Sequence, residues 1–249
     1  MPSGIGDVDS SKIVVMVPTS AIPSHPATTL MDETIAGIKF HFPDAQIIIL
    51  ADGIWSQLEH RRNQYENYLK AIEGRYPKTR IIQFPVHTQQ TAMAQYAIQN
   101  FVQTKLIFWN EHDAPLRTDR AIDWDAIVQQ VESGDAGLVR FTYFDEGIHE
   151  AHEHLTRGRY RVGDATFVKT VQFSGWSFMT TPNFFITKIF NGQPIGREML
   201  ELRMYNQVVH APWEQYKIVI YVPDGPAQRF RHSNGRGFGV EERDPCDWG

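Results

Sequence analysis

The chain has 249 residues, of which 42% are hydrophobic and 12% aromatic, and its formal net charge is −5. This size and composition predict a globular protein with one large core. The negative charge argues against a protein that binds nucleic acid or an anionic membrane, because either partner requires a basic surface.

The single cysteine, Cys246, excludes a disulfide within the chain. The first twelve residues lack the basic and apolar segments of a signal peptide, and no run of about 18 apolar residues occurs. We therefore expect a cytoplasmic protein without a transmembrane segment.

Short apolar runs alternate with helical segments in the first half of the chain. We predict strands at residues 12–18, 44–53, 79–84 and 105–110, and helices at residues 29–41, 55–76 and 90–102. Nearly continuous apolar runs such as KIVVMVP are typical of strands buried on both faces. The alternation predicts an α/β fold with a Rossmann-like, mostly parallel sheet, right-handed crossovers and helices on both faces.

The pattern changes after residue 125. Strands without long helices between them are predicted at 136–144, 159–163 and 166–173, followed by helices at 182–191 and 197–209 and closing strands at 216–222 and 227–232. An antiparallel or mixed section is therefore expected to complete the sheet. No repeat, linker or low-complexity block interrupts the chain, so we expect one domain over residues 1–249.

Polar residues stand where three of the predicted parallel strands end: Pro18-Thr19-Ser20, Asp52-Gly53 and Glu111-His112-Asp113. Ligands of open α/β sheets bind beyond the carboxyl ends of the strands, so these residues are expected to converge on one crevice. Two nearby carboxylates repel each other unless a cation relieves them. Oxygen ligands favour Mg²⁺ or Mn²⁺, which complete their coordination with phosphate oxygens. The alternative is structural: Glu111 caps the next turn, and Asp113 pairs with Arg117 or Arg120.

Several stretches resemble a bacterial group of family-2-like glycosyltransferases with the A-type fold of nucleotide-diphospho-sugar transferases. They are TSAIPSHPATTLMDETI, FWNEHDAPL, FDEGIHEAHEH, VKTVQFS, MLELRMYNQVV and IYVPDG followed by RHSNGR. The resemblance spans roughly residues 13–236. It implies a nucleotide-binding half at 12–117 and an acceptor and catalytic half at 118–235, with flexible ends at 1–11 and 236–249.

The resemblance also implies ligand-binding roles. Thr19 and Asp52 match the positions that hold the nucleoside, and Glu111 and Asp113 match the acidic metal motif, with Glu in place of its first Asp. His232 matches a late histidine that binds the metal, which an imidazole does more readily for Mn²⁺ than for Mg²⁺; the alternative is a surface histidine. The remaining residues expected at the nucleotide are Pro18, Ser20, Gly53, His112 and Arg236.

The family carries a catalytic acid at the start of a late helix, where it takes the proton of the acceptor hydroxyl. The matching stretch here is REMLELRM, in which Glu201 is followed by Leu202 instead of a second acid. Either Glu201 is the base, or Glu198 replaces it, or catalysis has been lost. In the structural alternative both glutamates pair with Arg197 or Arg203.

Other patterns are weaker. Gln172 and Trp176 are candidates for contacts with the sugar or the acceptor, although Trp176 is equally explained by core packing. The histidines of GIHEAHEHL (147–155) lack the spacing of a zinc-protease motif and are interpreted as a polar loop. The GRGFG stretch neither follows a clear strand nor opens a helix, so the dinucleotide fingerprint is rejected.

The resemblance and these residues together imply a metal-dependent, inverting transfer of a sugar from a nucleoside diphosphate sugar to a carbohydrate or other hydroxyl acceptor. UDP-sugar is the favoured donor, because the resemblance assigns uracil recognition to Asp52. Two alternatives remain open. One is a nucleotidyltransferase of similar fold, and the other is a non-catalytic domain that binds sugar nucleotides or glycans.

Overall fold

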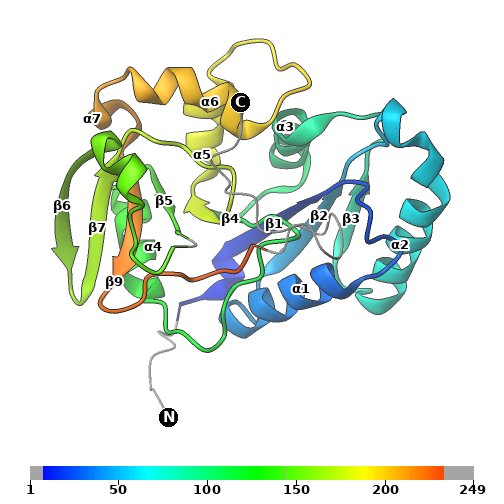
Figure 1. Ribbon diagram of the computed structural model, residues 1–249, viewed down its shortest axis with the longest axis horizontal. Coiled ribbons are helices and arrows are strands. Elements are labelled where there is room, and N and C mark those ends of the chain that lie inside the picture. Colours follow the sequence, from blue (N-terminus) through cyan, green and yellow to red (C-terminus); the bar gives the residue numbers. More distant parts are fainter. Residues whose placement is uncertain (1–7, 143, 233–249) are drawn as a thin grey trace.

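A nine-stranded mixed sheet forms the centre of the computed structural model, which describes residues 8–142 and 144–232. Its strand order is β3-β2-β1-β4-β8-β5-β9-β7-β6 (Figure 1). The first four strands in this order are parallel, and the rest of the sheet is mixed. This confirms the α/β class and the mostly parallel first half.

The first half of the chain follows the predicted alternation closely. Its elements are η1 (Ser10–Lys12), β1 (Ile13–Thr19), α1 (Thr29–His41), β2 (Gln46–Ala51), η2 (Ser56–Arg61), α2 (Arg62–Arg75), β3 (Arg80–Gln83), α3 (Gln89–Phe101) and β4 (Leu106–Trp109). All seven residues of β1 are buried, as expected for a central parallel strand. The turn η1 lies within the segment expected to be a flexible end, and its Ser10 is buried.

The second half adds shorter elements. They are α4 (Trp124–Ser133), β5 (Leu138–Arg140), η3 (Glu150–Leu155), β6 (Thr156–Val162), β7 (Ala165–Thr170), β8 (Phe178–Thr180), α5 (Pro182–Phe184), the π-helix η4 (Phe185–Phe190), α6 (Leu200–Val209), α7 (Trp213–Tyr216) and β9 (Ile218–Pro223). Strand β8 lies antiparallel between β4 and β5, while β5 and β9 are parallel. The mixed section that the sequence predicted is therefore present.

Helices cover both faces of the sheet. Alternate residues of β1 point to opposite sides, so that Val15 and Val17 pack with α1, α2 and α4 while Val14 and Met16 pack with α3, η4 and α6. None of the helices in the described part of the chain is long and apolar enough to cross a membrane.

Several local features differ from the sequence prediction, including the short helices η3 and α7, which were not predicted. Helix α4 was not predicted, although Asp123 caps its first turn by accepting from the amide of Ala126 and Gly134 ends it in a left-handed conformation. Strand β8 was missed because its three residues are too few to show a period of two. Residues 227–232 are not a regular strand; they form only an isolated bridge between Leu116 and Phe230.

Candidate functional site at the carboxyl ends of β1, β2 and β4

The ends of three neighbouring strands meet at one edge of the sheet. The backbone amide of Asp52 donates to the carbonyl of Thr19 at 2.9 Å, which joins the end of β2 to that of β1. His112, just after β4, lies with its Nδ1 3.2 Å from the Pro18 carbonyl, and its own carbonyl accepts from Thr34 Oγ1 at 2.8 Å. The structure therefore brings the three predicted strand-end motifs together.

Asp113 contacts His232. Nε2 of His232 lies 3.6 Å from Oδ2 of Asp113, and Oδ1 of Asp113 is buried without a hydrogen-bond partner among the residues described. Burial raises the pKa of Asp113, but the contact with His232 and the charges of His112 and His232 together lower it below its usual value. This carboxylate is therefore held in its ionised form, as a cation ligand must be.

The segment that carries His232 is placed by backbone hydrogen bonds. The amide of Arg117 donates to the Arg229 carbonyl at 2.8 Å, and the amide of Arg231 donates to the Pro115 carbonyl at 3.0 Å. Residues 229–231 thus run antiparallel beside 115–117, which brings His232 to Asp113. The side chain of Trp176 stacks on His232, with ring centroids 5.4 Å apart.

Glu111 is linked to the start of α6. Its Oε1 accepts a hydrogen bond of 2.6 Å from Nε2 of Gln90, and Oε1 of Gln90 accepts from the amide of Leu200 at 3.3 Å. A glutamine on α3 therefore connects the end of β4 to the first turn of α6. Sequence reasoning missed Gln90, which carries no signal besides its place at a helix start.

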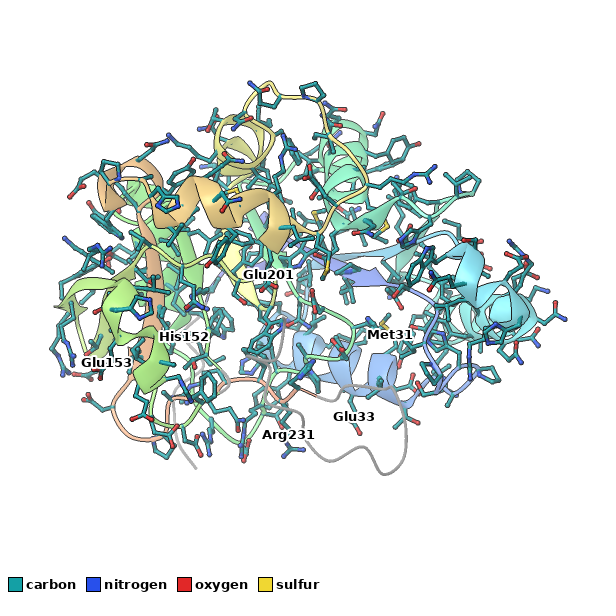
Figure 2. The ribbon with its side chains drawn as sticks, turned by 45° about the horizontal axis from the view of Figure 1, so that its top comes forward. Met31, Glu33, His152, Glu153, Glu201 and Arg231 are labelled. Carbon is teal, nitrogen blue, oxygen red and sulfur yellow. The ribbon has the colours of Figure 1, made fainter. Side chains whose placement is uncertain are left out.

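Glu201 faces the interior of the site. Its Oε1 accepts from the Gly175 amide at 2.7 Å and from the Ser174 hydroxyl at 3.1 Å. Figure 2 shows Glu201 in the first turn of α6, on the side toward the strands. A Cβ built on Gly175 would lie 3.2 Å from Cγ of Glu201 and 3.6 Å from Oε1 of Glu111. Two carboxylates therefore flank the same glycine, and a Cβ at this position would crowd Glu201 and contact Glu111.

Glu198 has a different environment. It forms an ion pair with the buried Arg203, whose guanidinium also donates to the carbonyls of Ile189 and Phe190 at 2.6 and 3.0 Å. The alternative in which these glutamates pair with arginines therefore holds for Glu198. It does not hold for Glu201, which contacts Ser174 and Gly175. Leu202, in the position of the missing second acid, is 69% exposed.

Asp52 supports the loop before α3. Its carboxylate accepts from the amides of Thr88 and Gln89 at 2.6 and 3.1 Å and lies 3.0 Å from Nδ1 of His87. Gly53 permits this close approach, because a Cβ there would lie 2.1 Å from the carbonyl carbon of Val86. Asp52 therefore holds the loop 86–89 against the end of β2, and its role in nucleoside binding stays a prediction.

An exposed aromatic group lies beside this loop. Trp55 is 46% exposed and stacks on His87 with ring centroids 6.0 Å apart. Sequence reasoning placed Trp55 in a helix and gave it no role.

Thr19, at the end of β1, is buried, and its Oγ1 lies 3.3 Å from the hydroxyl of Tyr68.

The remaining predicted residues are distributed as follows. Oε1 of Gln172 accepts from the guanidinium of Arg140 at 2.7 Å. Burial lowers the pKa of Arg140 to about 10, and the charge of Glu201 partly opposes this. Ser20 is half-buried beyond β1, and Arg236 lies outside the described residues. Sequence reasoning missed Ser174, Gly175 and Arg140, although Ser174 and Gly175 directly precede the tryptophan that it singled out.

The structural alternative for Asp113 is wrong. Arg117 pairs with Asp119 and Arg120 pairs with Asp145.

In the histidine-containing loop, residues 147–155, the His149 side chain accepts from the Ala151 amide at 3.2 Å and so caps η3.

The fold is that of known sugar-nucleotide enzymes. No family model matches the sequence, and no curated protein matches it. The chain is similar to the mannosyltransferase PcManGT from Pyrobaculum calidifontis in complex with GDP-Man and Mn²⁺, with a TM-score of 0.54 and 10% identity over 86% of this chain and 55% of that one. It is also similar to S. aureus TarS 1-349, with a TM-score of 0.53 and 10% identity over 88% of this chain and 59% of that one.

A third solved structure, GalNAc-T7 with UDP, GalNAc and Mn²⁺, gives a TM-score of 0.50 and 11% identity over 95% of this chain and 45% of that one. The chain thus spans about half the length of these proteins. At such low identity the likeness establishes the fold alone. The protein has the A-type fold of nucleotide-sugar glycosyltransferases, as the sequence predicted.

The strand-end residues fit a divalent cation in their chemistry. The ionised Asp113, with its buried Oδ1, and the imidazole of His232 are donors that Mn²⁺ accepts. Within residues 8–142 and 144–232, no group of three His, Cys, Asp or Glu side chains is placed to hold an ion as it stands. Ions that bind together with nucleotides commonly complete their coordination with water and phosphate oxygens.

Proposed function

We propose that the protein is a glycosyltransferase that moves a sugar from a nucleoside diphosphate sugar, UDP-sugar being favoured, to an acceptor hydroxyl. The observation that carries this proposal is the meeting of Glu111 and Glu201 at Gly175, beside the Asp113–His232 pair, on a sheet of the A-type fold. Two solved structures of this fold contain Mn²⁺ with GDP-Man or with UDP and GalNAc. We therefore place the nucleotide at the ends of β1, β2 and β4.

Asp113 and His232 would hold the Mn²⁺ or Mg²⁺ ion, with Glu111 close by. When bound, such an ion neutralises the charge of the departing diphosphate. The protein's own part is to place Asp113 beside His232 and to fix Glu111 through Gln90. The stack of Trp176 on His232 limits the motion of that imidazole.

Glu201 is assigned as the general base. Both of its hydrogen bonds with Ser174 and Gly175 are made by Oε1, so the carboxylate is oriented through one oxygen and Oε2 can take the acceptor's proton. As that O–H bond breaks, the acceptor oxygen bonds to the anomeric carbon, and the bond from this carbon to the diphosphate oxygen breaks with its electron pair going to the diphosphate. Attack opposite the leaving group inverts the anomeric configuration.

The first test is a thermal-shift panel of nucleotides with and without Mn²⁺. A ligand that binds the folded state raises its Tm, and we expect UDP to do so only with the ion. The second test measures UDP released from UDP-sugars with added sugar acceptors. Metal-dependent binding of UDP without turnover on any acceptor would instead support a binding domain, and diphosphate release from UTP with a sugar phosphate would support a nucleotidyltransferase.

A further inference from the structure

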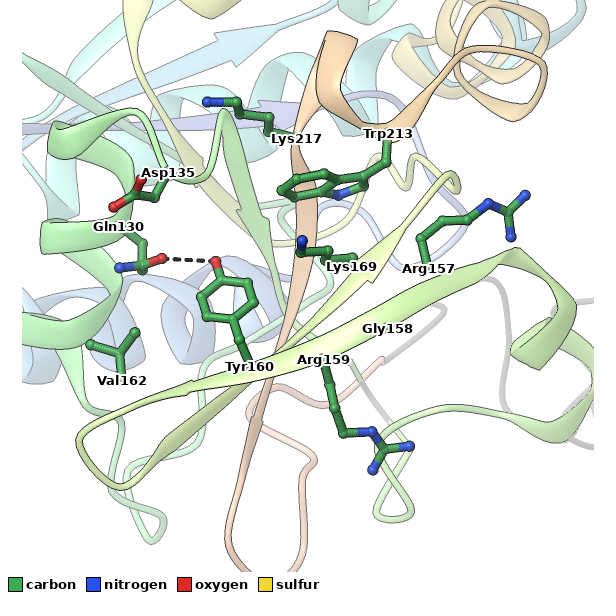
Figure 3. A pocket seen from close by; sticks show the side chains of 10 residues that line it. All are labelled: Gln130, Asp135, Arg157, Gly158, Arg159, Tyr160, Val162, Lys169, Trp213 and Lys217. Carbon is green, nitrogen blue, oxygen red and sulfur yellow. Dashed lines mark hydrogen bonds between the residues drawn. The ribbon is translucent and has the colours of Figure 1, made fainter.

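A cavity of about 510 Å³ lies at the far end of the sheet. Its lining includes four basic residues, Arg157, Arg159, Lys169 and Lys217, and two aromatic residues, Tyr160 and Trp213 (Figure 3). Strand β6, which borders the cavity, is five places from β4 in the sheet. No residue of that site lines it.

Lys169 stands at a position where the strand pattern calls for an apolar residue. Ala165, Phe167 and Lys169 alternate onto the same face of β7, and the first two are buried in the core under α4. The Lys169 ammonium lies 4.3 Å from the ring centroid of Trp213 and 5.9 Å from that of Tyr160. Within the described ranges no carboxylate forms an ion pair with Lys169. Its charge therefore lies against the Trp213 ring, in the wall of the cavity.

Tyr160 is fixed as one wall. Its hydroxyl donates to Oε1 of Gln130 at 2.7 Å (Figure 3), and its ring stacks on Phe167. Burial, and after it the charge of Asp135, raise the pKa of Tyr160 to about 12, so the phenol remains a donor at neutral pH. Trp213 is fixed by a hydrogen bond of 2.8 Å from Nε1 to the Ile218 carbonyl. Both rings are therefore preorganised.

Strand β6 is irregular where it borders the cavity. Its register against β7 shifts between Thr156 and Arg159, and Gly158 has a φ of 96°. A bulge of this kind bends a strand and redirects its side chains, and bulges are frequent beside binding sites. Arg157, within this irregular stretch, lines the cavity, and its Nη1 donates to the carbonyls of His154 and Thr156 at 2.9 and 2.8 Å.

The cavity concentrates positive charge in an acidic protein. The whole chain has a net charge of −5, yet the lining includes Arg157, Lys169 and Lys217 and only one acid, Asp135. Arg159 also borders the cavity, but it pairs with Val168, so its side chain is on the opposite face of the sheet from Tyr160 and Lys169. Asp135 accepts from Ser133 at 2.8 Å, and Lys217 donates to the Gly134 carbonyl at 2.8 Å. Such a surface attracts anions.

We propose that this cavity binds an anionic saccharide, with a sugar ring against Tyr160 and Trp213 and its carboxylate or phosphate on Lys169 and Arg157. Cations alone would bind any anion, and the rings alone would bind any apolar group, but the combination suits a ligand that carries both an acid and a sugar face. The volume lies within the range of small-molecule sites. This site goes beyond the proposed transfer reaction and does not depend on it.

The test is a calorimetric titration of the 249-residue chain with four probes: a galacturonic acid disaccharide, galactose 6-phosphate, a neutral galactose disaccharide and inorganic phosphate. We expect the first two to bind and the neutral sugar to bind at least about tenfold more weakly, because charged hydrogen bonds are the stronger ones. Which acidic probe binds more tightly decides between a carboxylate and a phosphate ligand. The same comparison in Glu201→Gln should be unchanged, so failure of the proposed transfer activity would leave this result intact.

Variants locate the binding. Lys169→Met should weaken the acidic sugars about tenfold, Lys169→Arg should restore most of the affinity, and Arg157→Ala should also weaken them. Arg161→Ala is the matched control, since Arg161 is on the same strand but pairs with Asp224 outside the cavity. The proposal is overturned if none of the sugars binds, if Lys169→Met binds as well as the wild type, or if inorganic phosphate binds as tightly as galactose 6-phosphate.

Discussion

The imidazole of His232 lies 3.6 Å from the carboxylate of Asp113, although one residue follows β4 and the other ends the described part of the chain. The contact depends on residues 229–231 running beside 115–117. It joins a strand of the parallel half to a segment that comes after the last strand, so both halves of the chain build the site.

Asp113→Asn should abolish the effect of Mn²⁺ on UDP binding. We expect Mn²⁺ affinity to fall by more than about 100-fold, since even the outer-shell partners of metal ligands contribute about 10- to 100-fold. Calorimetry with Mn²⁺ and UDP measures this. Asp119→Asn is the control, because Asp119 pairs with Arg117 at the surface. Unchanged nucleotide affinity in Asp113→Asn would show that the metal site lies elsewhere.

Glu201→Gln should remove the base while leaving the donor site in place. We expect kcat to fall roughly 10²- to 10⁴-fold, the usual contribution of general base catalysis, with little change in the Kd for UDP. Initial rates and UDP titrations on the same preparation separate the two. Ser174→Ala should lower kcat less, since the Gly175 amide still orients the carboxylate. A fully active Glu201→Gln would remove Glu201 from the mechanism.

Glu198→Gln should act on stability instead of catalysis. It leaves the buried guanidinium of Arg203 without its ion pair, which we expect to lower the free energy of unfolding by about 1 to 3 kcal/mol. Urea denaturation measures this. The exposed pair of Glu59 with Arg62 provides the control, and Glu59→Gln should have little effect. A stable but inactive Glu198→Gln would assign the catalytic role to Glu198.

Gly53→Ala should disturb the loop that Asp52 holds. Its Cβ would meet the backbone of Val86 at 2.1 Å, so we expect a loss of about 2 kcal/mol or more. At Gly74, inside α2, a Cβ meets nothing within 4 Å, and Gly74→Ala should stabilise the protein by up to about 1 kcal/mol. Equal effects of the two substitutions on Tm would contradict the close approach.

Stability should fall as the pH is lowered below neutrality. Burial, and then the charges of His112 and Arg61, lower the pKa of His25 to about 3 from 6.5. Between these values the unfolded chain binds a proton that the folded protein does not, so the free energy of unfolding decreases with decreasing pH by up to about 1.4 kcal/mol per pH unit. Above pH 7 this contribution is constant.

Urea denaturation at pH 7 and pH 5 tests the dependence. In His25→Gln the free energy of unfolding should depend less steeply on pH than in the wild type. The remaining dependence should come from His41, because burial also lowers the pKa of that side chain. His25 stacks on Tyr68 at 3.9 Å, so the variant is expected to be less stable at both values. An identical slope in the variant would rule out His25 as its source.

Sequence patterns were sufficient for most of the fold. The β-branched runs of β1, β2 and β4 and the periodic helices between them reflect local burial, which each segment shows in its own residues. Helix α4 could have been found from Asp123 and Gly134, which mark its ends. Strand β8 could not, because three residues owe their strand conformation to β4 and β5 on either side.

The candidate site likewise contains residues that the sequence could identify and partners that it could not. Candidate residues could be identified where each stands next to a recognisable helix or strand. They are the acids after β4, the polar residues at the ends of β1 and β2 and the glutamate at the start of α6. Their partners were not: Gln90 beside Glu111, Gly175 beside Glu201 and the loop 86–89 around Asp52 come from distant segments. A hydrogen bond between residues far apart in the chain leaves no period or spacing in the sequence, and it forms only when packing of the sheet and its helices brings the two segments into contact.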